Sequence, residues 1–208
     1  MSGPDPAADE DAGATSEPAG EPKGAEADPK AAEPVDDLVT THHTLKVGRR
    51  SLRYTATTGR VVLREEEHKD GTFGGHKARA ELSLTSYVLD DADARTRPVT
   101  FAFNGGPGSS SVWLHLGLLG PRRVVSGDVG ALEPPPYDLV DNPESLLAVS
   151  DLVFIDPMST GYSRAVEGGK PGEYHGYQKD VESVAELIRL WTSRNGRWMS
   201  PKFLAGES

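Results

Sequence analysis

Hydrophobic and polar positions alternate along the chain between residues 44 and 89. Alternation with a period of two is typical of strands that bury one face. Three such strands in succession favour an antiparallel meander. The pattern predicts strands over 44–59, 60–68 and 79–89, a hairpin turn at Thr58-Gly59 and a loop over 70–75.

Beyond residue 98 the alternation gives way to short, continuous apolar runs at 99–103, 151–156 and 202–206. Such runs are typical of strands buried on both faces, as in a parallel sheet. A helix is predicted over 175–195, and its apolar face consists of Val181, Val184, Ala185, Ile188 and Trp191. A strand, a helix and a strand make a βαβ crossover. The predicted fold class is α/β, with the antiparallel meander leading into a doubly wound parallel sheet.

Residues 1–38 differ in composition from the body of the chain, residues 39–208. The first 37 residues contain eleven acidic side chains, two lysines, six prolines and no aromatic residue, which accounts for −9 of the net charge of −10. A segment that can bury so little apolar surface is predicted to be disordered. The body is therefore nearly neutral, which argues against a nucleic-acid partner, since nucleic acid requires a clustered basic face.

Targeting and redox signals are weak in this sequence. No apolar segment of the signal-peptide type follows Met1, and no apolar run approaches the roughly 18 residues of a membrane span. The chain contains no cysteine, so no disulfide is expected. These features predict a cytoplasmic protein with no membrane partner; the oligomeric state stays open.

Each of the three apolar runs ends in a loop of unusual composition. The loops are 104–111 (NGGPGSSS), 156–163 (DPMSTGYS) and Gly206-Glu207-Ser208. Ligands bind beyond the carboxyl ends of parallel strands, so we expect the three loops to converge. A glycine-rich loop can hold an oxyanion, although a plain tight turn is an alternative. A phosphate loop is disfavoured because neither GxxxxGK[ST] nor GxGxxG is present.

Gly206-Glu207-Ser208 also matches the first half of the nucleophile elbow, G-x-S-x-G. Together with NGGPGSSS and IDPMSTGYS, in this order, it resembles the serine carboxypeptidase family of α/β-hydrolases. Residues 141–145 (DNPES) are similar to a further segment of that family. The resemblance covers residues 98–208 well and 44–97 loosely.

The resemblance implies a serine-type carboxypeptidase that removes C-terminal residues from peptides through an acyl-enzyme. It assigns the nucleophile to Ser208 and the oxyanion hole to Gly106. It assigns the binding of the substrate's C-terminal carboxylate to Asn104, Gly105 and Glu207. No cofactor and no metal are predicted, and adjacent His42 and His43 in a strand would point to opposite faces.

The sequence departs from the family at several positions. Leu118 stands where the family often has a second glutamate, which favours an esterase or acyltransferase as an alternative. Phe103 replaces a tryptophan, Met158-Ser159 replace Val-Gly, and Ser109 stands where many members have a disulfide cysteine.

The position of Ser208 adds an expectation about the chain itself. In this fold the triad runs Ser, then Asp or Glu, then His along the chain, so both partners would follow residue 208. We therefore expect an incomplete α/β-hydrolase, an N-terminal fragment that is poorly folded and inactive alone. The alternative from another class is a non-catalytic interaction module, which predicts a monodisperse chain with a cooperative melting transition.

Overall fold

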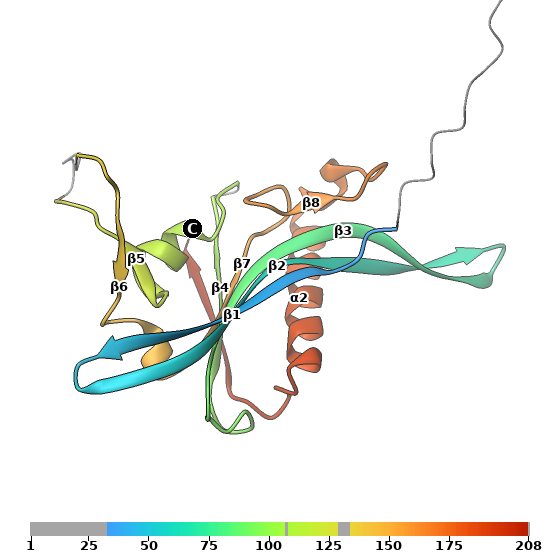
Figure 1. Cartoon of the computed structure of the whole chain (residues 1–208). Coiled ribbons are helices and arrows are strands. Elements are labelled where there is room, and N and C mark those ends of the chain that lie inside the picture. The colour runs from blue at the N-terminus through green and yellow to red at the C-terminus, as the bar shows by residue number, and fades with distance from the viewer. Residues whose placement is uncertain (1–32, 107, 129–133, 208) are drawn as a thin grey trace, which may run out of the picture. The chain divides into compact units, whose positions relative to one another are not determined.

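A computed structural model describes residues 33–106, 108–128 and 134–207 of the chain (Figure 1). Most of the predicted disordered tail therefore lies outside the described residues. Within the described part, strand β1 begins at Asp37. Three acidic residues just before or at this point form ion pairs with later parts of the chain: Glu33 with Arg64, Asp37 with Arg60, and Asp36 with Arg194.

The first three strands form the antiparallel meander that the alternation predicts. They are β1 (Asp37–Val47), β2 (Arg50–Lys69) and β3 (Thr72–Leu89). The predicted turn at Thr58-Gly59 is wrong, because both residues lie inside β2 and the turns lie at Gly48-Arg49 and Asp70-Gly71. The loop predicted over 70–75 is correspondingly shortened to two residues.

Position 59 requires glycine for a reason other than a turn. Its φ is +144°, and a Cβ atom there would come within 1.9 Å of the Asp37 carbonyl oxygen. Only glycine allows the start of β1 to approach β2 this closely. Gly59 thus serves close strand packing rather than chain reversal.

The three continuous apolar runs form parallel strands, as predicted. They are β4 (Val99–Asn104), β7 (Asp151–Ile155) and β9 (Lys202–Glu207). Strand β4 lies between β7 and β9 and is parallel to both, whereas β3 joins β7 in antiparallel pairing. The seven-stranded sheet has the order β1-β2-β3-β7-β4-β9, and the short β8 (Arg164–Ala165) pairs with β3. The fold is therefore mixed α/β.

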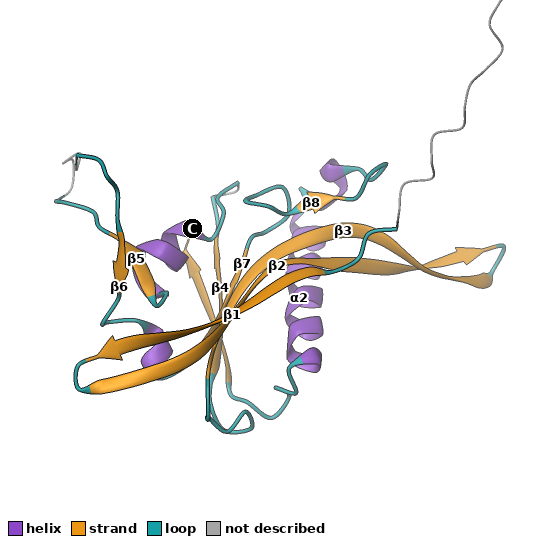
Figure 2. Cartoon of the chain, viewed as in Figure 1, coloured by secondary structure: helices purple, strands orange, loops and turns teal. Residues whose placement is uncertain are grey.

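Each face of the sheet carries its own hydrophobic core. On one face, Val99, Phe101, Val153 and Ile155 pack against helix α2 (Tyr177–Arg194), which lies beside the strands in Figure 2. On the other face, Ala102, Leu152 and Phe154 pack against short helical segments. Alternate residues of the same strand serve opposite cores, as the pleat requires.

Helix α2 confirms the predicted helix and three residues of its predicted packed face: Trp191 is buried, and Val184 and Ile188 are partly buried against the core. Leu187 and Trp191 are buried against the sheet, and the ring of Trp191 meets Phe101 edge-on at 5.6 Å. Val181 and Ala185, which were assigned to the packed face, are exposed. The packed face also includes Ser183 and Leu187, which the predicted face lacks.

The remaining elements are short. They are α1 (Val112–Leu114), the π-helix η1 (His115–Leu119), β5 (Arg122–Val124), β6 (Leu139–Asp141), and the 3₁₀ turns η2 (Leu146–Ala148) and η3 (Pro171–Tyr174). Within the residues described, none of the helices has the length and apolar character to cross a bilayer.

Candidate active site

The loops that follow β4 and β7 begin at the same end of the sheet, where β9 also ends. The register of β4 and β9 places Phe103 beside Gly206 and Asn104 beside Glu207. Strand β7 runs along the other side of β4, so the loop that starts at Asp156 lies next to the glycine-rich loop. The sheet order therefore brings the two loops and the end of β9 to one edge, and Gly206 and Glu207, predicted as part of a loop, lie inside β9.

Asn104 connects the glycine-rich loop to the end of β9. Its Nδ2 donates a hydrogen bond of 2.7 Å to Glu207 Oε2, and its Oδ1 accepts one of 3.2 Å from the Leu114 backbone N–H. The Gly105 N–H donates to the Glu207 carbonyl oxygen. Asn104 is 1% exposed, so its amide is a buried polar group with its partners in place. Three of the sequence-predicted site residues are thus brought together: Asn104, Gly105 and Glu207.

Gly106 has a backbone conformation that requires glycine. Its φ is +128°, and an added Cβ would lie 3.3 Å from the Gly108 nitrogen. Among the described residues, no acceptor is found for the Gly106 N–H. An exposed backbone N–H at a strand end is the type of donor that stabilises a developing oxyanion. The predicted oxyanion role of Gly106 is compatible with this geometry.

Asp156 ties the glycine-rich loop to the loop after β7. Its Oδ1 accepts a hydrogen bond of 3.0 Å from the Ser111 N–H, and Ser111 Oγ donates to the Ile155 carbonyl. Its other oxygen lies where a side chain at position 161 would be, since a Cβ on Gly161 would come within 2.0 Å of Asp156 Oδ2. Sequence reasoning assigned no role to Asp156, although it opens the second family-like motif.

His115 packs against side chains of β7 and β3. Its ring stacks on Phe154 with centroids 4.4 Å apart, and its Nε2 shares a hydrogen bond of 2.7 Å with the Tyr87 hydroxyl. Burial lowers the pKa of His115 to about 4, although the negative charge of Asp156 acts to raise it. Burial also raises the pKa of Tyr87, so both groups are neutral at pH 7. His115 is therefore a packing residue.

The histidine side chains in the described residues make no hydrogen bond to loop residues 104–111 or 206–207. His175 contacts the loop after β7, where its Nε2 lies 3.1 Å from Ser159 Oγ.

Ser159 in the loop after β7 has φ +66°, a left-handed conformation that glycine adopts more readily. This explains why the family pattern has glycine at that position.

Large apolar side chains surround the loops. Those more than two-fifths exposed are Val112 and Trp113 of α1, Leu118 of η1, and Tyr162 of the loop after β7. Isolated exposed apolar residues are ordinary, and these four share only their position along the chain after the glycine-rich loop or within the loop after β7. No cluster of three or more His, Cys, Asp or Glu side chains suited to a metal occurs in the described portion.

Two positions of the predicted site loops fall outside the described residues. Ser208, the predicted nucleophile, is one, and Pro107 within the glycine-rich loop is the other. The described part of the site therefore consists of the predicted oxyanion loop without Pro107 and of the two residues that precede the predicted nucleophile.

The model of the serine carboxypeptidase family matches residues 86–208 of the chain. The chain belongs to the serine carboxypeptidase family. No curated protein matches the chain. The matched range begins at Ser86 in β3 and includes all three loops of the site.

Proposed function

We propose that this serine carboxypeptidase-family chain carries the nucleophile and oxyanion loop of an α/β-hydrolase that removes C-terminal residues from peptides. One observation carries the proposal: Asn104 Nδ2 and Glu207 Oε2, from opposite ends of the matched region, lie 2.7 Å apart. This contact holds the glycine-rich loop against the residue that precedes Ser208. It supports an elbow and an oxyanion loop that act on one substrate carbonyl.

In the proposed reaction Ser208 Oγ attacks the carbonyl carbon of the last peptide bond. The Oγ proton passes to a general base and then to the departing amine, as the C–N bond breaks. The Gly106 N–H donates to the carbonyl oxygen while it carries negative charge. Water then hydrolyses the acyl-enzyme and restores the serine.

We assign recognition of the substrate's C-terminal carboxylate to Asn104, Gly105 and Glu207. The Asn104 side chain is held by Glu207 and by the Leu114 N–H, so its amide has a fixed orientation. Substrate positioning of this kind converts a bimolecular encounter into an oriented one. The exposed rings of Trp113 and Tyr162 favour apolar residues near the cleaved bond.

The test uses the protein as its gene encodes it. A fluorophosphonate probe is expected to label it at Ser208, and N-blocked dipeptides with a free C-terminus are expected to be hydrolysed. Ser208→Ala should abolish both. Ser110→Ala is the matched control, because it removes a hydroxyl from the neighbouring loop without removing the nucleophile. Labelling that persists in Ser208→Ala would refute the proposal.

An esterase or acyltransferase is the second candidate, and Leu118 favours it. Its side chain is 60% exposed on the π-helix η1, where the family often has a glutamate. Leucine cannot share a hydrogen bond with Glu207, which weakens the case for a free carboxylate in the substrate. Comparing matched peptides that end in a free carboxylate or a methyl ester separates the two. A preference for the ester of at least tenfold in kcat/KM would select the second candidate.

A further inference from the structure

Strand β1 forms one edge of the seven-stranded sheet, and among the described residues nothing pairs with its outer side (Figure 1). It runs for 11 residues from Asp37 to Val47 and contains no proline. Its pairing with β2 is regular throughout, whereas the pairing of β2 with β3 shifts register twice. Proteins usually shorten, bulge or interrupt such edges. This edge is therefore able to pair with another strand.

The free hydrogen-bonding groups of β1 belong to alternate residues. The turn at Gly48-Arg49 makes Val47 and Arg50 the first hydrogen-bonded pair of the hairpin, and such pairs recur at every second residue. The main-chain groups of the odd-numbered residues thus point to β2. Those pointing outward belong to Leu38, Thr40, His42, Thr44 and Lys46.

We propose that two copies of the chain pair through β1, antiparallel, about a two-fold axis beside His42. Such an axis is perpendicular to the sheet, so outward-pointing residues must face one another. An axis beside His42 satisfies this requirement, and because His42 is the middle residue of β1, the two copies pair along the whole strand. Thr40 then faces Thr44 of the second copy, and Leu38 faces Lys46 of the second copy. All five outward residues take part, which gives on the order of ten backbone hydrogen bonds.

The charges at the ends of β1 select this antiparallel arrangement. Asp36 and Asp37 lie at its start, where they also pair with Arg194 and Arg60 of the same chain, and Lys46, Arg49 and Arg50 lie at its end. Antiparallel pairing brings the acidic end of one copy beside the basic end of the other. Opposite charges across strands contribute favourably, and like charges directly opposite are unfavourable. A parallel arrangement would set the basic ends side by side.

The centre of the strand adds no charge that opposes pairing. Residues 38–45 contain no acidic residue, lysine or arginine, and three of them are threonines. Threonine facing threonine is a favourable cross-strand pair, and β-branched residues suit a strand. The same sequence therefore supplies both sides of the interface, which identifies a second copy of this chain as the partner.

The absence of cysteine from the chain makes a direct test simple. A single His42→Cys variant can form a disulfide only with another copy. We expect it to give a covalent dimer under mild oxidation. Thr44→Cys is the matched control on the same exposed strand. Its two sulfurs would be separated by four residues along the strand, roughly 13 Å, which is beyond the reach of a disulfide.

Sedimentation velocity of the unmodified protein gives a second measurement that needs no variant. We expect a concentration-dependent equilibrium between monomer and dimer. His42→Lys places two like charges opposite each other at the axis, and it should raise the dimer dissociation constant at least tenfold. Gln178→Lys adds the same charge on helix α2 and should leave the constant unchanged.

Three results would overturn the proposal. One is a monomer at every concentration, including a monomer that instead captures an extended peptide at this edge. Another is equal crosslinking of the His42→Cys and Thr44→Cys variants, which would mean a different register or a random encounter. The third is a dimer that His42→Lys leaves intact, because its interface must then lie elsewhere. Far-UV circular dichroism of each variant establishes that the sheet is retained.

Discussion

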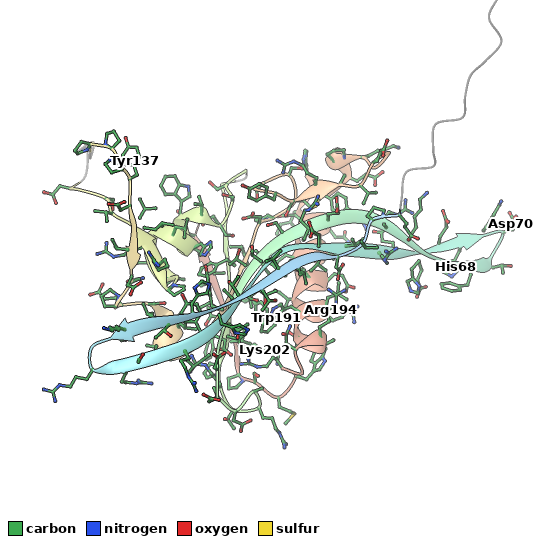
Figure 3. The ribbon with its side chains drawn as sticks, viewed as in Figure 1. His68, Asp70, Tyr137, Trp191, Arg194 and Lys202 are labelled. Carbon is green, nitrogen blue, oxygen red and sulfur yellow. The ribbon has the colours of Figure 1, made fainter. Side chains whose placement is uncertain are left out.

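Arg197 and Asp151 form a buried ion pair at the end of the sheet opposite the candidate site. Both side chains are 2% exposed, and Arg197 Nη1 contacts Asp151 Oδ2. Arg97 Nε lies 2.7 Å from the other oxygen of Asp151, and the Leu89 N–H also donates to it. One carboxylate thus joins β3, β7 and the loop between α2 and β9. Figure 3 labels Lys202, which is the first residue of β9.

Removing this carboxylate is expected to destabilise the fold strongly. Asp151→Asn leaves the charges of Arg97 and Arg197 buried without an anion, which costs about 3–5 kcal/mol in the free energy of unfolding. Urea denaturation measures the change. Glu186→Gln is the control, because its ion pair with Arg189 is partly exposed to solvent and should contribute less than about 1 kcal/mol. Equal effects of the two variants would contradict the structural role of Asp151.

The link between Asn104 and Glu207 leads to a prediction about catalysis. Asn104→Ala removes the 2.7 Å donor to Glu207 and the acceptor for the Leu114 N–H. We expect kcat/KM for a peptide with a free C-terminus to fall by roughly 100-fold, since misplacement of a positioning group costs about this much. Asn195→Ala, which removes a side-chain hydrogen bond at the end of α2, should leave kcat/KM unchanged. An unchanged kcat/KM in the Asn104→Ala enzyme would show that the contact is unrelated to function.

Gly161 and Gly168 permit a matched test of the contact between the loops. Both have positive φ, +47° and +75°, but a Cβ at 161 would collide with Asp156 whereas one at 168 meets nothing within 4 Å. Gly168→Ala should cost only the strain of a left-handed alanine, about 1–2 kcal/mol. Gly161→Ala should cost more and should also lower activity, because it displaces the carboxylate that holds Ser111. Melting curves and hydrolysis rates check the two effects separately.

The lowered pKa of His115 leads to a prediction of how the free energy of unfolding depends on pH. Its pKa is about 4 in the folded protein, below the 6.5 of an ordinary histidine, because its ring is buried. The unfolded chain therefore binds a proton more readily between these values, and the free energy of unfolding should fall as the pH drops from 6.5 to 4. The full effect is about 3 kcal/mol.

The pH prediction has a direct control. His115→Gln removes the titrating ring, so the difference in unfolding free energy between pH 7 and pH 4.5 should be smaller than in the unmodified protein. Carboxyl groups elsewhere titrate in both proteins, so their contributions to the unfolding free energy cancel in the comparison. An identical pH dependence in the two proteins would show that the ring is accessible to protons in the folded state.

The error at Gly59 shows where sequence patterns mislead. A threonine and a glycine between two alternating stretches are a normal turn signal. The actual turns contain Gly48 and Gly71, each with positive φ and open space around it. Local sequence does not separate a glycine that reverses the chain from one that lets a neighbouring strand approach. The neighbour in question, Asp37, lies 22 residues earlier in the sequence.

The sequence by itself determined the parallel strands, the meander, the helix between β7 and β9, and the grouping of the three loops. These follow from periodicity and from motif order, which are properties of neighbouring residues. Only the tertiary structure decided the partners of the buried polar groups. Tyr87 and His115 are 28 residues apart, Asp151 and Arg197 are 46 apart, and Asn104 and Glu207 are 103 apart. Such pairs depend on strand order and register, and burial makes them necessary because each polar group has left water.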